Sequence, residues 1–244
     1  MCELFLFVKN SLSEGKMEQF DYIKSNLKDL TNEIGRLSQR YGRDITLVAV
    51  TKSGSDEELV ALAAMGIGDI GENRPGELKR RGELLYEKGY TPRLHEIGNL
   101  QRNKVKLIID KVDLIHSLDS IALAEEINKA AIKVGRRVKV LIEINSAREG
   151  QKGGILPEDA EEFYLKVKDL PGIEVVGLMT MGPALDDPED MRPYFRETKK
   201  LFDRMNETYR FSDGILSMGM SDSYIVAIEE GATLVRVGRR IFQR

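Results

Sequence analysis

Ile45-Thr46-Leu47-Val48-Ala49-Val50-Thr51-Lys52 is the stretch that decides the fold of this chain. The run is apolar and rich in β-branched residues, a Ser53-Gly54 turn closes it, and a helical pattern follows. This pattern is typical of a buried parallel strand. The sequence therefore predicts that Lys52 lies at the carboxyl end of a strand.

Lys52 has two interpretations at such a position. An unpaired ammonium group in apolar surroundings is costly, and its pKa shifts instead. A lysine that loses its charge is a nucleophile and can form a Schiff base with a carbonyl compound. Alternatively, the side chain extends from the rim of the sheet into water. This stretch alone leaves both interpretations open.

The composition is that of a soluble globular protein. The chain has 244 residues, of which 41% are hydrophobic and 32% charged, with a formal net charge of −3. One α/β barrel of this length is a single domain. Because the chain has no basic excess and no Lys/Arg block interleaved with aromatic residues, nucleic acid is not an expected partner.

The N-terminal residues carry no sign of a membrane anchor. Cys2 is the only cysteine, which excludes an internal disulfide framework and fits a reducing cytoplasm. The apolar run of residues 4–8 is too short to span a membrane and has no basic leader. We expect residues 1–16 to form a flexible tail, residues 17–244 to form one domain, and the protein to be cytoplasmic, without a membrane association.

The remaining chain alternates strands and helices. Apolar residues spaced three and four apart from Met17 to Tyr41 predict an amphipathic helix. The predicted strands are 45–52, 67–70, 94–97, 113–117, 138–145, 173–179, 215–217 and 233–237. The predicted helices are 55–65, one reaching about 88, 102–109, 119–134, one starting at 157, 190–209 and 221–231. Eight alternations without a linker favour a closed (β/α)₈ barrel of the TIM type with an extra N-terminal helix. An open doubly wound sheet is the alternative.

Polar residues follow most of these strands. In a parallel sheet the ligand site lies at the carboxyl ends of the strands. The residues expected there are Lys52, Glu72, Asn73, His95, Asn99, His116, Ser117, Asn145, Met179, Thr180, Ser217, Ser221, Arg236, Val237 and Gly238. A lysine that forms an imine opposite a phosphate cradle is the arrangement that pyridoxal 5'-phosphate (PLP) needs.

Two segments could form the cradle. Ser217-Met218-Gly219-Met220-Ser221 places hydroxyl groups and a glycine at a helix start, where free backbone N–H groups favour an anion. The Ser221 hydroxyl could equally be only an N-cap. Arg236-Val237-Gly238-Arg239 adds a guanidinium group and a glycine that a phosphate can approach closely. An arginine facing the pyridine nitrogen would keep it unprotonated, because arginine retains its own proton.

Several motifs in a consistent order resemble a known family. They are LVAVTK, IGEN, HEIGNLQRNK, IHSLDS, INSAREGQKGG, VVGLMTMGP, LSMGMSDS and VRVGRRIF, between residues 47 and 242. The chain resembles the YggS/PROSC family of PLP-binding proteins, the pyridoxal phosphate homeostasis proteins. The resemblance covers almost all of the chain beyond its first sixteen residues.

The resemblance implies a barrel similar to the N-terminal domain of alanine racemase (PLP fold type III), with PLP held as a Schiff base on Lys52. It implies that Ser221, Gly238 and the backbone of Arg239 hold the phosphate and that Arg236 faces the ring nitrogen. The full set of implied cofactor-binding residues is Lys52, Asn73, Ser217, Met218, Ser221, Arg236, Gly238 and Arg239. Arg239-Arg240 departs from the small residues usual there, and these side chains either strengthen anion binding or point to solvent.

Other polar residues have weaker functional interpretations. His95 and His116 are the only histidines, and such strand histidines are more often core or rim residues than catalysts or metal ligands, so no metal site is expected. Lys104 is expected on a solvated helix. Lys152 is a loop residue that is either a solubility residue or a transient second PLP site. Glu143 and Asp69 show no identifiable acid–base partner.

Three functions compete: a PLP carrier and regulator, a PLP-dependent racemase-type enzyme, and a phosphosugar enzyme on the same barrel. Racemisation needs a base on each face of the substrate, and in alanine racemases a second domain supplies one of them. We expect no such domain after the eighth strand. The expected function is therefore intracellular PLP homeostasis without robust catalysis, by a monomer that passes PLP to apo-enzymes. A racemase of low activity is the alternative.

Overall fold

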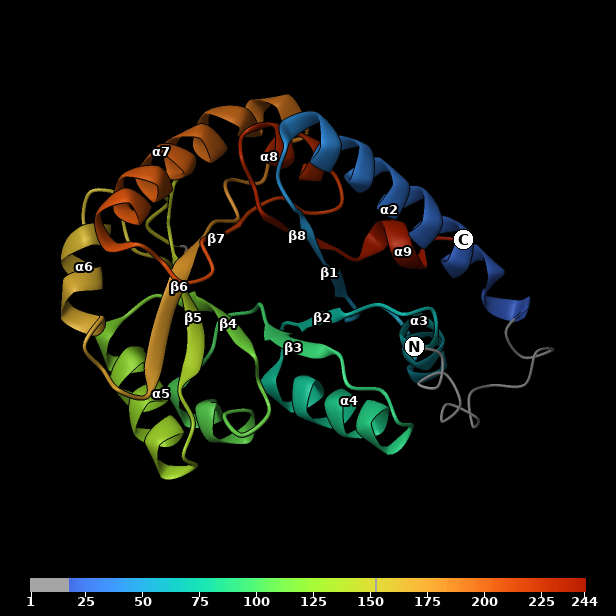
Figure 1. Ribbon diagram of the computed structural model, residues 1–244, viewed down its shortest axis with the longest axis horizontal. Coiled ribbons are helices and arrows are strands. Elements are labelled where there is room, and N and C mark those ends of the chain that lie inside the picture. Colours follow the sequence, from blue (N-terminus) through green and yellow to red (C-terminus); the bar gives the residue numbers. More distant parts are fainter. Residues whose placement is uncertain (1–17, 152) are drawn as a thin grey trace, which may run out of the picture.

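The structure is a computed structural model that describes residues 18–151 and 153–244. Eight parallel strands form a closed barrel in chain order, and β1 pairs with β8 to close it (Figure 1). The strands are β1 (Thr46–Val50), β2 (Asp69–Glu72), β3 (Arg93–Glu96), β4 (Leu114–Leu118), β5 (Val138–Glu143), β6 (Ile173–Met179), β7 (Ile215–Ser217) and β8 (Leu234–Val237). The predicted barrel is confirmed, and the open sheet is excluded.

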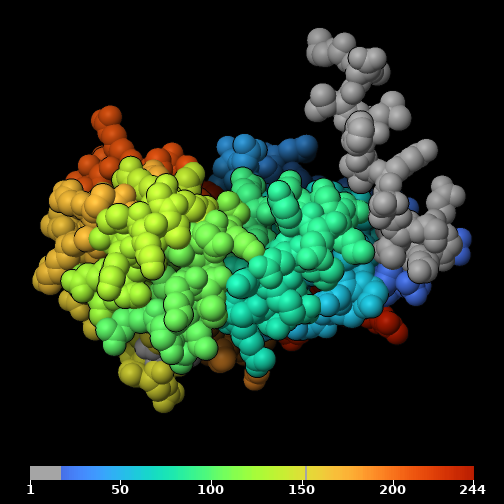
Figure 2. Space-filling model, turned by 90° about the horizontal axis from the view of Figure 1, so that it is seen from below, coloured from blue at the N-terminus to red at the C-terminus, as the bar shows by residue number. Residues whose placement is uncertain are grey.

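Helices cover the outside of this barrel. They are η1 (Glu18–Phe20), α2 (Asp21–Tyr41), α3 (Asp56–Ala64), α4 (Pro75–Glu87), η2 (Arg102–Leu107), α5 (Ile121–Lys133), α6 (Ala160–Val167), η3 (Pro188–Met191), α7 (Arg192–Tyr209), α8 (Tyr224–Glu229) and α9 (Arg239–Phe242). Figure 2 shows one side of the molecule, where the segments from α4 to α5 form much of the surface. No helix among the described residues is long and apolar enough to cross a membrane.

Helix α2 is the extra helix predicted from the sequence. Its buried face consists of Ile23, Leu27, Leu30 and Ile34, and it packs against α3, α8 and α9. The Asn26 amide donates hydrogen bonds to the carbonyl oxygens of Ile241 (3.2 Å) and Gln243 (2.8 Å). Helix α2 therefore joins the first and last parts of the barrel across the β1–β8 seam.

Several predicted boundaries were wrong. The helix expected at 102–109 is the 3-10 segment η2, because its backbone bonds span three residues, as from Ile108 N–H to the Val105 carbonyl (3.1 Å). Helix α6, which connects β5 to β6, begins at Ala160 rather than 157, and α9 was not predicted. Residues 1–16 and Lys152, for which predictions were made from the sequence, lie outside the described residues.

The barrel interior has an apolar half and a polar half. The apolar half consists of Val48, Leu114, Leu141, Val176, Met179 and Leu234. The polar half consists of Asp69, His95, His116, Ser217 and Arg236, each at most 6% exposed. Because buried polar groups must find partners, this second half needs a complete set of hydrogen bonds.

Candidate functional site

A cavity of about 510 Å³ opens at the carboxyl ends of the strands. Six of the eight residues predicted to bind the cofactor line it: Lys52, Asn73, Ser221, Arg236, Gly238 and Arg239. They come from the segments after β1 and β2, from the β7–α8 turn, and from the end of β8 with the start of α9. The other two, Ser217 and Met218, are fully buried and lie outside this lining.

Lys52 lies two residues beyond β1, and its exposed side chain lines the cavity. The buried guanidinium group of Arg81 on α4 donates hydrogen bonds to the backbone carbonyl oxygens on both sides of Lys52. One goes to Thr51 and the other, of 2.7 Å, to Gly54. Helix α4 therefore fixes the backbone that carries the lysine.

Arg81 is itself held by a buried carboxylate. Its guanidinium lies 2.8 Å from Glu72 Oε1, and Glu72 also accepts a hydrogen bond from the Thr51 hydroxyl. Burial raises the pKa of Glu72, although Thr51 and Arg81 oppose that rise. The sequence analysis missed Arg81. The signal was present, because Leu78, Gly82 and Leu85 lie on the buried face of α4 and Arg81 shares it.

Ser221 and Gly238 face each other across the β7–α8 and β8–α9 segments. The Gly238 N–H donates to Ser221 Oγ at 3.3 Å. Because α8 begins at Tyr224 with Ser223 as its N-cap residue, the N-cap interpretation of Ser221 was wrong. A Cβ atom at Gly238 would lie 2.8 Å from the Val50 carbonyl oxygen, so only glycine allows this close approach of β8 and β1.

The two departures from the family pattern point away from an anion-binding role for their side chains. Arg239 pairs with Asp222 at the surface, and Arg240 pairs with Glu33 (3.4 Å) and contacts Tyr224. At position 239, therefore, it is the backbone that remains available to a ligand in the cavity.

Arg236 is a buried charge rather than a surface one. Its Nη1 donates to Ser217 Oγ (2.5 Å) and its Nη2 to the Thr180 carbonyl oxygen (3.2 Å). Burial lowers its pKa to about 10, and the Glu143 carboxylate opposes this effect. These two bonds use two of the five N–H groups of the guanidinium, which also borders the cavity.

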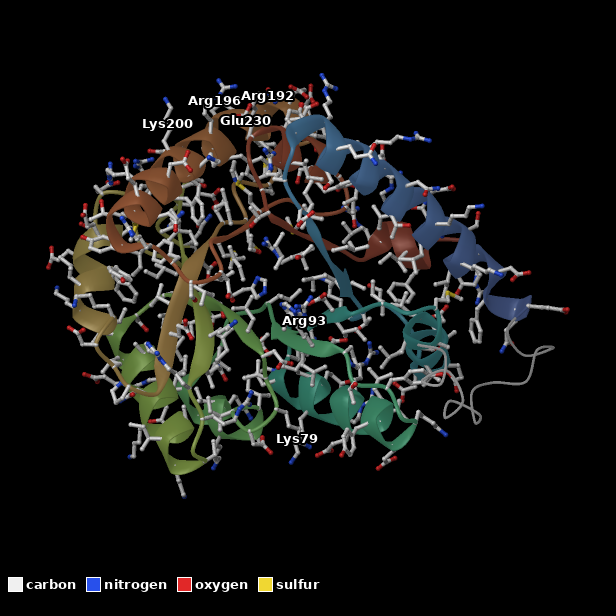
Figure 3. All side chains as sticks on the ribbon, viewed as in Figure 1. Lys79, Arg93, Arg192, Arg196, Lys200 and Glu230 are labelled. Atoms are coloured by element: carbon white, nitrogen blue, oxygen red, sulfur yellow. The ribbon has the colours of Figure 1, made fainter. Side chains whose placement is uncertain are left out.

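Ser217 connects Arg236 to both histidines. His116 Nδ1 lies 3.0 Å from Ser217 Oγ, His116 Nε2 lies 3.0 Å from His95 Nδ1, and His95 Nε2 lies 2.8 Å from Asp69 Oδ1. The expectation that Asp69 has no identifiable acid–base partner was wrong, because His95 contacts it. Arg93 on β3, labelled in Figure 3, also pairs with Asp69 at 2.7 Å. The interpretation of the histidines as core residues is confirmed.

Apolar residues that the sequence analysis did not assign to the site also line the cavity. They are Val50, Ile97, Met181, Ala184, Leu185, Pro188, Met191 and Met220. Five of them come from the segment between β6 and α7. The prolines of this segment were the sequence feature that could have indicated its place in the site.

A neighbouring cavity of about 200 Å³ shares Ile97, Gly98 and Met181 with the first. Burial raises the pKa of Glu143, which lines this neighbour, to about 7.

An ion-pair cluster braces the outer side of this region. Arg192 and Arg196 of α7 lie 3.0 Å and 2.8 Å from Glu230, which follows α8, and the three residues gather at one place in Figure 3. Such a network ties α7 to α8 behind the β7–α8 turn.

A comparison with protein families identifies this arrangement. The model described as "Alanine racemase, N-terminal domain" matches residues 25–243. The chain belongs to this family. Within it, the chain is similar to proteins named pyridoxal phosphate homeostasis protein. The one from Aquifex aeolicus is 42% identical over 88% of this chain and 95% of its own length. The one from Helicobacter pylori strain 26695 is 34% identical over 91% and 99%.

Solved structures share the barrel. PipY of Synechococcus elongatus with PLP bound has a TM-score of 0.79 and 27% identity, over 90% of this chain and 99% of that one. A protein from Bifidobacterium adolescentis described as unknown has a TM-score of 0.84 and 32% identity, over 96% and 99%. Alanine racemase of Clostridium difficile shares the fold at 19% identity, with a TM-score of 0.73 over 92% of this chain and 60% of the enzyme.

Proposed function

We propose that this chain binds PLP in the cavity at the carboxyl ends of its strands, covalently at Lys52, and takes part in PLP homeostasis. One observation carries the proposal: three separate segments of the sequence, which contribute Lys52, Ser221, and Arg236 with Gly238 and Arg239, line one cavity. The names of the family members and the PLP-bound PipY structure support it.

The residues present fit the chemistry of PLP. A phosphate needs hydrogen-bond donors, and Ser221 Oγ and the Gly238 N–H lie side by side. The backbone N–H of Arg239 begins α9, where first-turn N–H groups have no acceptor within the helix. The Arg236 guanidinium, a donor only, suits the lone pair of a pyridine nitrogen. A cavity of about 510 Å³ is within the usual range for small-molecule sites.

Lys52 is the group that would hold the cofactor covalently. When bound, PLP would supply an aldehyde with which the Lys52 amine could condense, with release of one water molecule. Arg81 keeps the backbone around Lys52 in place through the carbonyl oxygens of Thr51 and Gly54. The amine is therefore presented from a fixed turn, while its exposed side chain remains accessible for release.

The cavity lining favours binding of PLP over catalytic turnover. Among the described residues that line the cavity, the β6–α7 segment contributes apolar side chains, and Asp222 is paired with Arg239. We propose that the protein acts as a cytoplasmic monomer that limits free PLP and passes it to apo-enzymes. Asn73, which borders the cavity beside Gly98, is proposed to contact the bound cofactor. Ser217 and Met218 do not line the cavity and are proposed to support the bound cofactor through the residues that do.

The test compares purified wild type, Lys52→Ala and Lys104→Ala after incubation with PLP. Lys104 is an exposed lysine on η2 and outside the cavity lining, so it is a matched control. Borohydride reduction followed by peptide mass spectrometry should place the PLP adduct on Lys52 in wild type and Lys104→Ala. An adduct that persists at the same level in Lys52→Ala would refute the proposal.

A racemase activity is tested separately. The PLP-loaded protein is incubated with single-enantiomer amino acids, and the products are separated by chiral chromatography. The proposal expects no inversion beyond that of free PLP. Inversion that depends on Lys52 would make the protein an enzyme.

A further inference from the structure

The polar half of the barrel interior is one continuous chain of hydrogen bonds. It starts at Asp69 on β2, passes through His95 on β3 and His116 on β4, crosses the interior to Ser217 on β7, and ends at Arg236 on β8. All five side chains are at most 6% exposed. Only Arg236 of these five borders the cavity, so the hydrogen bonds lead from the opposite side of the barrel to the cavity.

Donor types give this chain a direction. Arginine only donates, so Ser217 Oγ accepts from Arg236. The Ser217 hydroxyl proton then goes to His116 Nδ1, which leaves His116 Nε2 as the N–H donor to His95 Nδ1. His95 Nε2 in turn donates to the Asp69 carboxylate, which only accepts. The opposite direction would leave the Ser217 proton without an acceptor in this chain.

The electrostatics of the interior agree with this direction. Burial, with His95 and Arg236 as further causes, lowers the pKa of His116 well below its usual range. His116 is therefore neutral and has one N–H, as the directed chain requires. The Asp69 charge at the far end is balanced by Arg93, whose Nε and Nη2 lie 2.7 Å from its two oxygens.

We propose that Asp69, His95, His116 and Ser217 are positioning residues that hold the Arg236 guanidinium at the cavity through this directed chain. The inference rests on the proposed function, because the series of hydrogen bonds would support the Arg236 guanidinium, the group that would face the PLP ring nitrogen. Every bond of this hydrogen-bond chain joins a donor to an acceptor, so rotation of any one side chain would break at least two hydrogen bonds.

Nitrogen-15 NMR of the histidine rings in the apo protein tests the direction without any cofactor. We expect His116 as the Nε2–H tautomer, with an unprotonated Nδ1. The Nδ1–H tautomer at His116 would reverse the chain and overturn the proposal. Asp69→Asn keeps the size of the side chain but removes its charge, so it should shift the His116 ring nitrogens. Unchanged His116 shifts would also overturn it.

PLP titration tests the positioning role. Ser217→Ala removes the link between His116 and Arg236 and should weaken PLP binding about tenfold, the effect of one hydrogen bond. Ser117→Ala is the matched control, since Ser117 is a buried strand serine whose Oγ has no partner among the described residues. Equal affinities for Ser217→Ala and wild type would refute the role. A wild type that binds no PLP would refute the proposed function instead, while the NMR result would still stand.

Discussion

The guanidinium group of Arg81 donates a 2.7 Å hydrogen bond to the backbone carbonyl oxygen of Gly54, two residues after Lys52. A buried arginine usually neutralises a carboxylate, and Arg81 also does that with Glu72. Here the same group fixes a turn of the main chain. The position of the Lys52 amine therefore depends on a residue that does not line the cavity.

We call the Arg81 hydrogen bonds to Thr51 and Gly54 the clamp, and its removal should lower the stability of the protein. Arg81→Met leaves Glu72 buried without its charge partner, and we expect the free energy of unfolding to fall by about 3–5 kcal/mol. Urea denaturation measures it. The adjacent Arg80→Met is the control, because the Arg80 ion pairs with Asp56 and Glu77 are exposed and worth less than about 1 kcal/mol. Equal losses for both variants would contradict the clamp.

Gly98 and Asn73 line the cavity from adjacent loops. A Cβ atom at Gly98 would lie 2.3 Å from the Asn73 carbonyl oxygen, so Gly98→Ala must separate the loops after β2 and β3. We expect a loss of about 1–3 kcal/mol in stability and weaker PLP binding, measured by thermal unfolding and by titration. Wild-type PLP affinity in the variant would show that the contact between these loops does not shape the site.

Gly35, unlike Gly98, is a glycine whose replacement by alanine should stabilise the protein. It lies inside helix α2, where a Cβ atom would meet nothing within 4 Å. Because alanine is the better helix former, Gly35→Ala should stabilise the protein by about 0.5–1 kcal/mol. Thermal unfolding measures the gain, and unchanged PLP affinity is expected because the position is outside the cavity. A destabilised variant would mean that α2 needs conformational freedom at this position.

Glu96 should make stability depend on pH. It is fully buried, and burial together with Glu72 raises its pKa to about 8 from 4.5, against a hydrogen bond from the Gly98 N–H. Between these two pH values the folded protein holds a proton that the unfolded chain has released, so the free energy of unfolding falls as pH rises.

Glu96→Gln keeps the shape of the side chain and its acceptor for Gly98 but does not ionise. We expect the variant to match wild type near pH 4.5 and to be more stable by roughly 2–4 kcal/mol near pH 8. Denaturant unfolding across this range measures the difference. Parallel pH profiles for the two proteins would show that Glu96 is not the group responsible.

The sequence allowed the barrel to be predicted because its strands are short apolar runs that alternate with helical patterns. The same runs placed Lys52, Arg236 and Gly238 at strand ends, and all three line the cavity. Ser217 shows where this reasoning stops. It precedes Ser221 by four residues, yet it lies inside the barrel, fully buried, and bonds to His116 and Arg236.

The missed contacts depend on neighbours that one sequence does not specify. His116 and Ser217 are 101 positions apart and meet only because β4 and β7 face each other across a closed barrel. The partnership of Asp69 with His95 depends on the register between β2 and β3, in which Gly71 lies beside His95. Apolar periodicity predicts that a residue is in a strand, but it does not give the distance of that residue from the rim.

The β1–β8 seam, which α2 bridges, has a consequence for synthesis of the protein. Lys52 follows the first strand to leave the ribosome, whereas Arg236, Gly238 and Arg239 belong to the last, and the barrel closes only when β8 pairs with β1. A nascent chain therefore carries Lys52 for most of translation without a cavity around it. Cofactor capture should begin only once the final strand has been made, so that bound vitamin marks a finished molecule.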